Sequence, residues 1–215
     1  NNFRYSKSKK INNEKAIYNL KNNFFEICNK IFNIFKKKNS FVFFEHYFDK
    51  KNFILLNMKL SQIPYFLNPF EKLEKDFQNY SKKNFLVREK LFDNLKLNND
   101  FEKFLIINLK KDLPTFIIED FNHIQKNTDK IDLKPKFIFS GGLHWSNQHF
   151  KHWLAKNISK GVKFISLEHG GSFPYKHPYF FFEEKNSNKF ITWFSKYHKN
   201  HKQLPAQKLL KIKDI

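Results

Sequence analysis

The chain has 215 residues, of which 40% are hydrophobic and 19% aromatic, so it can bury a core and is not a disordered polymer. Its one cysteine, Cys28, excludes an internal disulfide and a cysteine-based zinc site within the chain. The formal net charge of +20 favours polyanions, including nucleotide phosphates and acidic membrane surfaces. Because the lysines are spread through every segment and mixed with Asn, Ile and Phe, we interpret them as a solvated surface and do not expect nucleic acid as the partner.

No apolar run approaches the roughly 18 residues that a membrane-crossing helix needs, and the N-terminus lacks an apolar signal core. A single cysteine fits a reducing compartment, so we expect a cytoplasmic protein. The start without a methionine suggests a piece of a longer chain.

The first 130 residues are predicted to be mainly helical. Apolar residues recur at spacings of three and four over residues 13–38, which indicates an amphipathic helix. Residues 41–44 fit either a short buried strand or the start of another helix, and residues 53–67 a helix or strand that changes direction at Pro64. Further helices are predicted over residues 71–80, 81–95 and 101–109, and from an N-cap at Thr115 to about residue 126, followed by a polar turn at 127–130.

Strands and a helix alternate from about residue 135 onward. An apolar run at residues 137–140 ends in a glycine pair, as expected of a buried strand that enters a loop. A helix then runs from a cap at Ser146 or Asn147 to a left-handed end at Gly161. This order is typical of a parallel, Rossmann-like sheet, so the predicted fold class is α/β with a helical N-terminal region. Further strands are predicted over residues 162–167 and 189–193.

The sharpest local feature is Glu168-His169-Gly170-Gly171, at the end of the second predicted strand, where ligands bind in open parallel sheets. His169 titrates near neutrality and can remove a proton from an attacking hydroxyl, so it is the candidate general base. Gly170 and Gly171 would let backbone amides approach a phosphate or sugar oxygen, and Glu168 is a candidate substrate contact beside them. The alternative is a turn whose glycines serve only its backbone angles.

A second glycine pair, Gly141-Gly142, stands one strand earlier and is followed by His144. The two loops could form facing walls of one cleft, which makes these three residues candidate substrate contacts. Ser172 and Lys176, in the loop after the second pair, are further candidates, Lys176 as a phosphate contact. The alternative for the earlier pair is an ordinary strand-to-helix turn.

Three histidines, His144, His149 and His152, lie close together, but no carboxylate stands within that cluster and no His-Glu-x-x-His pattern occurs. We therefore predict a solvated or lightly packed helix surface and no metal site. The sequence also lacks a Walker-type phosphate loop, a Gly-x-Gly-x-x-Gly fingerprint and a Gly-x-Ser-x-Gly elbow. Their absence counts against a nucleotide-hydrolysing motor, a dinucleotide oxidoreductase and an α/β-hydrolase.

Two adjacent carboxylates, Glu183 and Glu184, follow an aromatic run. One of them could orient His169 or act as an acid or base in its own right, and we assign this catalytic role to Glu184. The alternative is a charged pair that opens a surface turn.

Five motifs occur in order along the second half of the chain: Phe150-Lys151-x-Trp153-x-Ala155, Lys160-Gly161-Val162-Lys163, Glu168-His169-Gly170-Gly171, Glu183-Glu184 and Lys189-Phe190-Ile191-Thr192-Trp193. This set resembles a transferase family of bacterial surface-carbohydrate biosynthesis, whose members carry a Gln-His-Gly-Gly loop and a downstream His-Glu…Thr-Trp-Gly segment. The resemblance covers most of the chain from about residue 53 and is specific from 137 to 193. The sequence departs from the family pattern at Glu168, Glu183 and Phe194, which replace Gln, His and Gly.

The resemblance implies a glycosyltransferase-like enzyme that moves an activated sugar or polyol-phosphate unit to a cell-surface carbohydrate acceptor. The family is similar to two-domain transferases with the GT-B arrangement, which implies that this chain is the acceptor-side half. Residues 1–130 would be a helical part of that domain, 131–195 its strand–helix–strand core, and 196–215 a linker toward a donor-binding domain outside the chain. A nucleotide-activated donor is expected, with no tightly bound cofactor, and lipid-linked acceptors would place the enzyme at the inner membrane surface.

Two other interpretations stay open. A non-catalytic nucleic-acid-binding protein would fit the positive charge and would bind with steep salt dependence. A catalytically degenerate member that keeps the fold as a scaffold would fit the three departures from the family pattern.

Overall fold

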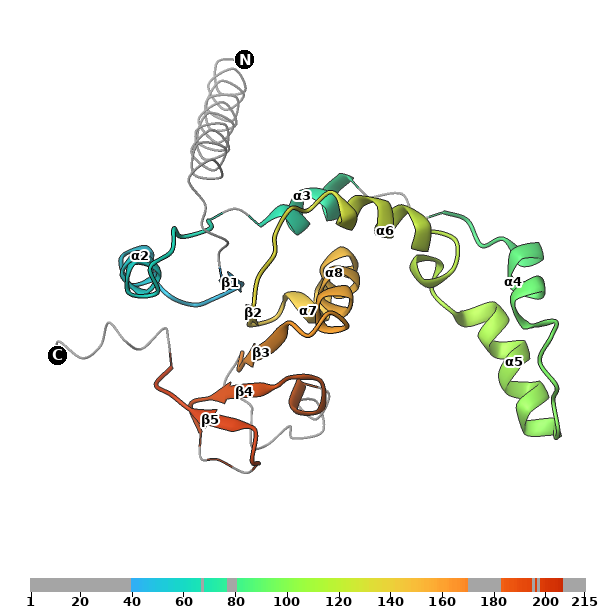
Figure 1. Cartoon of the computed structure of the whole chain (residues 1–215). Coiled ribbons are helices and arrows are strands. Elements are labelled where there is room, and N and C mark those ends of the chain that lie inside the picture. The colour runs from blue at the N-terminus through green and yellow to red at the C-terminus, as the bar shows by residue number, and fades with distance from the viewer. Residues whose placement is uncertain are drawn as a thin grey trace, which may run out of the picture.

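The structure, a computed structural model, describes residues 40–66, 68–76, 81–169, 183–194, 196 and 198–206. Its centre is a sheet in which neighbouring strands are parallel and follow one another in sequence order (Figure 1). This arrangement confirms the predicted α/β class with a parallel, Rossmann-like sheet. The five strands are β1 (Phe41–Phe44), β2 (Phe137–Ser140), β3 (Lys163–Leu167), β4 (Lys189–Thr192) and β5 (His201–Gln203).

The sheet extends on both sides of the range 131–195 that was expected to hold it. The run at 41–44 is a strand, and it pairs with β2 from Phe41 opposite Phe137 to Phe44 opposite Ser140. Strand β5 lies in the stretch expected to be a linker. The helix predicted over residues 13–38 lies outside the described residues.

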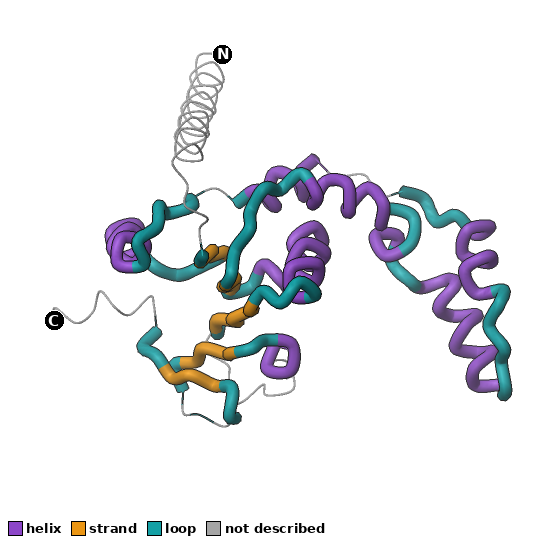
Figure 2. The backbone as a smooth tube through the Cα atoms, in the orientation of Figure 1, coloured by secondary structure: helices purple, strands orange, loops and turns teal. Residues whose placement is uncertain are grey.

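Helices connect and flank the strands (Figure 2). Part of the stretch 53–67, for which helix and strand both stayed open, is helical in α2. The helices predicted at 81–95 and 101–109 are present with shifted ends, and the one predicted at 71–80 is present as far as residue 76, beyond which 77–80 lie outside the described residues. A short helix before α8 was not predicted. None of the helices in the described part of the chain is long and apolar enough to cross a membrane. Their bounds are α2 (Lys50–Lys59), α3 (Pro69–Asp76), α4 (Phe85–Phe92), α5 (Asp100–Asp112), the 3-10 helix η1 (Thr115–Ile117), α6 (Phe121–Asp129), α7 (Leu143–Ser146) and α8 (Gln148–Ile158).

An N-capping asparagine and a left-handed glycine mark the two ends of α8, as predicted. The side chain of Asn147 accepts a 2.8 Å hydrogen bond from the amide of Phe150, which is the capping contact that starts a helix. Gly161 then takes a φ of +88°, the left-handed conformation that glycine adopts without a Cβ penalty. The helix is thereby held to the length that returns the chain to β3.

The predicted N-cap at Thr115 is wrong. Thr115 begins the 3-10 helix η1, and α6 starts only after Asp120 and continues through the stretch predicted as a polar turn. Both acidic residues before α6 bind another segment: Glu119 pairs with Arg88, and Asp120 accepts from the amide of Ser81. These contacts hold the connection away from helical geometry until Asp120.

The two faces of the sheet are covered by different helices, because successive residues of a strand point to opposite sides. On one face Phe43 packs edge-on against Phe53 of α2, with ring centroids 5.9 Å apart. On the other face Phe44 contacts Phe70 of α3 and Trp153 of α8, at 5.3 and 6.0 Å. The contacts on this second face belong to the main hydrophobic core, against which the ends of β1 and β2 are positioned.

Helices α4 and α5 lie side by side and project away from the sheet (Figure 1). Their base is fixed by Arg88, whose side chain is fully buried. Its Nε and Nη2 donate to the two carboxylate oxygens of Glu119 at 2.7 and 2.8 Å, and its Nη1 donates to the carbonyls of Lys110 and Leu113. The arm is therefore attached through a buried, bidentate ion pair.

Candidate active site

Polar side chains gather where the first four strands end. Glu45 follows β1, Ser140 ends β2, Glu168 and His169 follow β3, and Thr192 ends β4. Because the strands are parallel, their carboxyl ends share one edge of the sheet, where ligands bind in folds of this class. The site is therefore built from residues that are far apart in the sequence.

Glu183 is the hub of this edge. It opens a single helical turn and is fully buried. Its Oε1 accepts hydrogen bonds from Nε2 of His144 at 2.5 Å, from the indole Nε1 of Trp145 at 2.9 Å and from Oγ of Ser166 at 3.1 Å. The Nε2 of His169 lies 3.6 Å from the same oxygen.

These contacts keep Glu183 ionised. Burial is the largest single influence and raises its pKa, but the contacts with His144, His169 and Trp145 together outweigh burial and lower the pKa to about 2. A carboxylate only accepts hydrogen bonds, so Nε2 of His144 carries the proton. In the neutral imidazole, Nδ1 then accepts from the hydroxyl of Ser140, 3.1 Å away.

The prediction of a solvated or lightly packed histidine surface is wrong for two of the three residues. His144 is 4% exposed and His149 is fully buried, with its Nδ1 3.3 Å from Oε2 of Glu74 on α3. His152 is half-buried and meets the ring of Phe121 edge-on. Within the described ranges, no group of three or more His, Cys, Asp or Glu side chains is placed to hold a metal ion.

His169 follows β3 and keeps about a third of its side chain exposed, 33%. Its interaction with Glu183 is the main influence on its pKa and raises it, burial opposes this, and the charges of Glu45 and Glu168 add to the increase. The separation of 3.6 Å exceeds a direct hydrogen bond, so the two groups form a close ion pair when His169 is protonated. His169 is thus an accessible imidazole next to a fixed carboxylate.

Glu168 is 2% exposed and is held by β4. Its Oε2 accepts from the hydroxyl of Thr192 at 2.5 Å and from the amide of Trp193 at 3.1 Å. Burial foremost raises its pKa, against these two hydrogen bonds. Its Oε1 is buried and has no hydrogen-bond partner among the residues that the structure describes. A substrate contact by this oxygen stays a prediction.

The two adjacent carboxylates face different partners. Oε1 of Glu184 lies 2.8 Å from Nε2 of His201 on β5, and the backbone carbonyl of Glu184 accepts from the side-chain Nδ2 of Asn200 at 2.6 Å. Both glutamates are buried, so the alternative of a surface turn is wrong. The carboxylate beside His169 is that of Glu183. By position, the acid–base or orienting role that we assigned to Glu184 therefore fits Glu183.

The first glycine pair lies against Glu45. A Cβ on Gly141 would be 2.5 Å from the carbonyl oxygen of Glu45, and a Cβ on Gly142 would be 2.8 Å from its Oε2. Glu45 itself has a φ of +48°, an uncommon value for a residue with a side chain. The two glycines thus allow Glu45, at the end of β1, to pack closely against the loop after β2. Their role as substrate contacts stays a prediction. Other predicted contacts lie outside the described residues, namely Gly170, Gly171, Ser172 and Lys176.

Five residues of the site were not predicted as site residues from the sequence: Glu45, Ser140, Trp145, Ser166 and Thr192. Ser140 and Ser166 are paired in register and are fully buried. A serine near the end of an otherwise apolar strand could therefore have indicated a site residue. Glu45 follows the run at 41–44 and could have been found only by identifying that run as a strand. No pattern in the sequence marks Trp145.

Comparison with known proteins identifies the protein family of this chain. The model of the LIC12162 family transferase matches residues 1–215. No curated protein and no solved structure matches the chain. Since the match spans the whole sequence, this chain belongs to the LIC12162 family of transferases.

Proposed function

We propose that this chain is the acceptor-side part of a GT-B-type, glycosyltransferase-like enzyme that moves an activated sugar or polyol-phosphate unit to a cell-surface carbohydrate. The observation that carries the proposal is the pairing of His169 with Glu183 at the edge of the sheet, 3.6 Å apart. The pKa of the imidazole is raised and that of the carboxylate is lowered to about 2. Titratable neighbours whose pKa values are driven apart are typical of acid–base catalysis.

In the proposed step, neutral His169 takes the proton from an acceptor hydroxyl. The hydroxyl oxygen forms a bond to the anomeric carbon of a sugar donor, or to the phosphorus of a polyol-phosphate donor. The bond from that atom to the nucleotide leaving group breaks, and its electron pair leaves with the nucleotide. Glu183 stabilises the imidazolium that forms. A positioned general base such as His169 contributes a factor of about 10²–10⁴ in rate.

The charge of the described site favours a hydroxyl over a phosphate. Three carboxylates, those of Glu45, Glu168 and Glu183, lie close enough to His169 to raise its pKa. Carboxylates accept hydrogen bonds from sugar hydroxyls and repel phosphates. This supports an acceptor site here, with the nucleotide-activated donor bound chiefly by a separate domain. A cytoplasmic enzyme at the inner membrane surface would meet lipid-linked acceptors.

The test is a transfer assay with the native-length protein, radiolabelled nucleotide-activated sugars and polyol phosphates, and fragments of surface polysaccharide. We expect a labelled product with at least one donor, and a loss of about 100-fold or more in His169→Gln with an unchanged thermal midpoint. His123→Gln on α6, an exposed histidine away from the site, is the matched control and should retain full activity. Full activity in His169→Gln would remove the proposed role, and donor binding without any turnover in the wild type would support the scaffold interpretation.

A further inference from the structure

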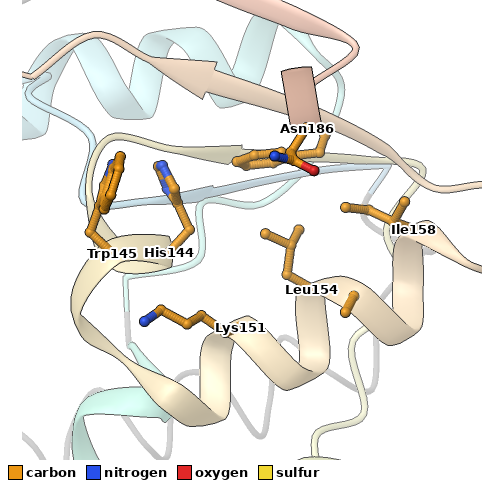
Figure 3. A pocket seen from close by; sticks show the side chains of 8 residues that line it. His144, Trp145, Lys151, Leu154, Ile158 and Asn186 are labelled. Carbon is orange, nitrogen blue, oxygen red and sulfur yellow. The ribbon is translucent and has the colours of Figure 1, made fainter. Parts of the chain in front are cut away.

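A pocket of about 440 Å³ lies beside α8, next to the site but outside the His169–Glu183 pair. Figure 3 shows Lys151, Leu154 and Ile158 projecting from α8 along one side, with Asn186 across from them. His144 stands at the end of the pocket nearer Lys151.

The helix side of the pocket is a single stripe. Its residues are spaced at i, i+3, i+4 and i+7, which places them on one face of a helix. From the first to the last, the stripe is roughly 10 Å long at 1.5 Å per residue. Three of its members are apolar and only the first is charged, in the order Lys151, Leu154, Ala155 and Ile158. The pocket is therefore long, apolar, and cationic at one end.

The aromatic end of the pocket is less polar than its residue types suggest. Both ring nitrogens of His144 are engaged, one by Ser140 and one by Glu183. The only ring donor of Trp145 is committed to the same carboxylate. Both rings consequently offer carbon faces and edges to a ligand, and their fixed positions connect the pocket to the hub of the site.

Lys151 is the charged group available at this end. It is half-buried, and no hydrogen bond or ion pair engages its ammonium among the residues that the structure describes. Burial lowers the pKa of Lys151, and the charge of Glu74 opposes this effect without reversing it. A partly desolvated ammonium of this kind gains most from an anionic partner.

We propose that this pocket binds the apolar chain of a single-chain anionic amphiphile, with the chain along α8 and the anionic head at Lys151. A nucleotide base fits less well, because its polar edges would be buried against Leu154, Ile158 and Phe164 without partners. The further statement that the amphiphile is the apolar anchor of the acceptor rests on the proposed function. Its head, at Lys151, would then lie at the end of the pocket nearer His144.

The experiment is isothermal titration calorimetry on the native-length protein with decyl phosphate, decanol and inorganic phosphate, each below its aggregation concentration. We expect saturable, one-site binding of decyl phosphate, weaker binding of decanol and none of inorganic phosphate at the same concentrations. Lys151→Gln should weaken decyl phosphate about tenfold and leave decanol unchanged. Ala155→Leu, which fills the pocket from an exposed position, should weaken both about tenfold.

Controls separate this proposal from the proposed function. Lys160→Gln and Lys160→Leu, at an exposed position just after α8, should bind decyl phosphate and decanol as the wild type does. His169→Gln should also bind decyl phosphate normally, since His169 does not line the pocket. Absence of saturable decyl phosphate binding, or equal binding in Ala155→Leu with an unchanged thermal midpoint, would overturn the pocket proposal even if transfer activity is found. Binding with no transfer by any donor would leave the pocket proposal standing and remove the acceptor role.

Discussion

The Nε2 of His169 lies 3.6 Å from Oε1 of Glu183, an oxygen that already accepts three hydrogen bonds. Donors from α7 and β3 hold the carboxylate in place, so its charge is positioned before any substrate arrives. Preorganised charge of this kind stabilises a developing cation without reorganisation during the reaction. The pair is thus prepared to accept a proton at His169.

The adjacent glutamates offer a matched test of this assignment. Glu183→Gln keeps the shape of the side chain but removes the charge beside His169, so we expect transfer activity to fall about 100-fold. Glu184→Gln changes a carboxylate that contacts His201, so we expect a loss of activity of about threefold or less and a loss of stability of about 1 kcal/mol. Initial transfer rates and urea unfolding would measure the two effects.

Both variants should retain the far-UV circular dichroism of the wild type. The assignment would be contradicted if Glu184→Gln lost more activity than Glu183→Gln at saturating acceptor, since the catalytic contact would then belong to the other residue.

The glycine pair after β2 should tolerate substitution unequally. Gly141→Ala would place a Cβ 2.5 Å from a backbone oxygen of Glu45, so the strand end must shift, at a cost of about 1–3 kcal/mol. Gly142→Ala would meet only the end of the Glu45 side chain, which can move, so we expect a cost below about 1 kcal/mol. Urea unfolding would measure the free energy of unfolding of each variant. Equal losses of stability would show that the close approach of Glu45 is not what restricts substitution at Gly141.

The arm formed by α4 and α5 should depend on its buried ion pair. Arg88→Met leaves the Glu119 carboxylate without its partner, and breaking a buried pair costs about 3–5 kcal/mol. Lys103→Met removes an exposed pair with Asp100 and should cost less than about 1 kcal/mol. Hydrogen exchange of α4 and α5, together with urea unfolding, would detect the loss. Equal effects in the two variants would contradict this account of the arm.

The sheet was predictable only where an apolar run meets glycine or turn residues. Strands β2, β3 and β4 meet that description, and α8 has clear ends at Asn147 and Gly161. The run at 41–44 is too short for periodicity to separate strand from helix, and its partner β2 lies far along the chain. Strand β5, His201–Gln203, carries no apolar pattern, so nothing in its sequence indicated a strand.

The site was predictable at His169 because the glycine pair marks a strand end. The choice between Glu183 and Glu184 was not, because sequence alone does not say which of two neighbours faces inward. That direction is set by the pairing of Glu184 with His201 on the unpredicted strand β5. The buried state of His144 likewise depends on Glu183, a residue distant in the sequence.

Glu183 is expected to raise the pKa of the His169 imidazole, and an NMR titration of that imidazole would show whether it does. Resonances of His169 can be assigned by comparison with His169→Gln, and its pKa measured in the wild type and in Glu183→Gln. Because the nearby carboxylate favours the imidazolium, we expect a pKa above the ordinary value of 6.5 in the wild type and a lower pKa in Glu183→Gln. The acid side of the pH–activity profile should move to lower pH in the same variant, since the base must be neutral to act. A wild-type pKa at or below 6.5, or one that Glu183→Gln leaves unchanged, would contradict this expectation.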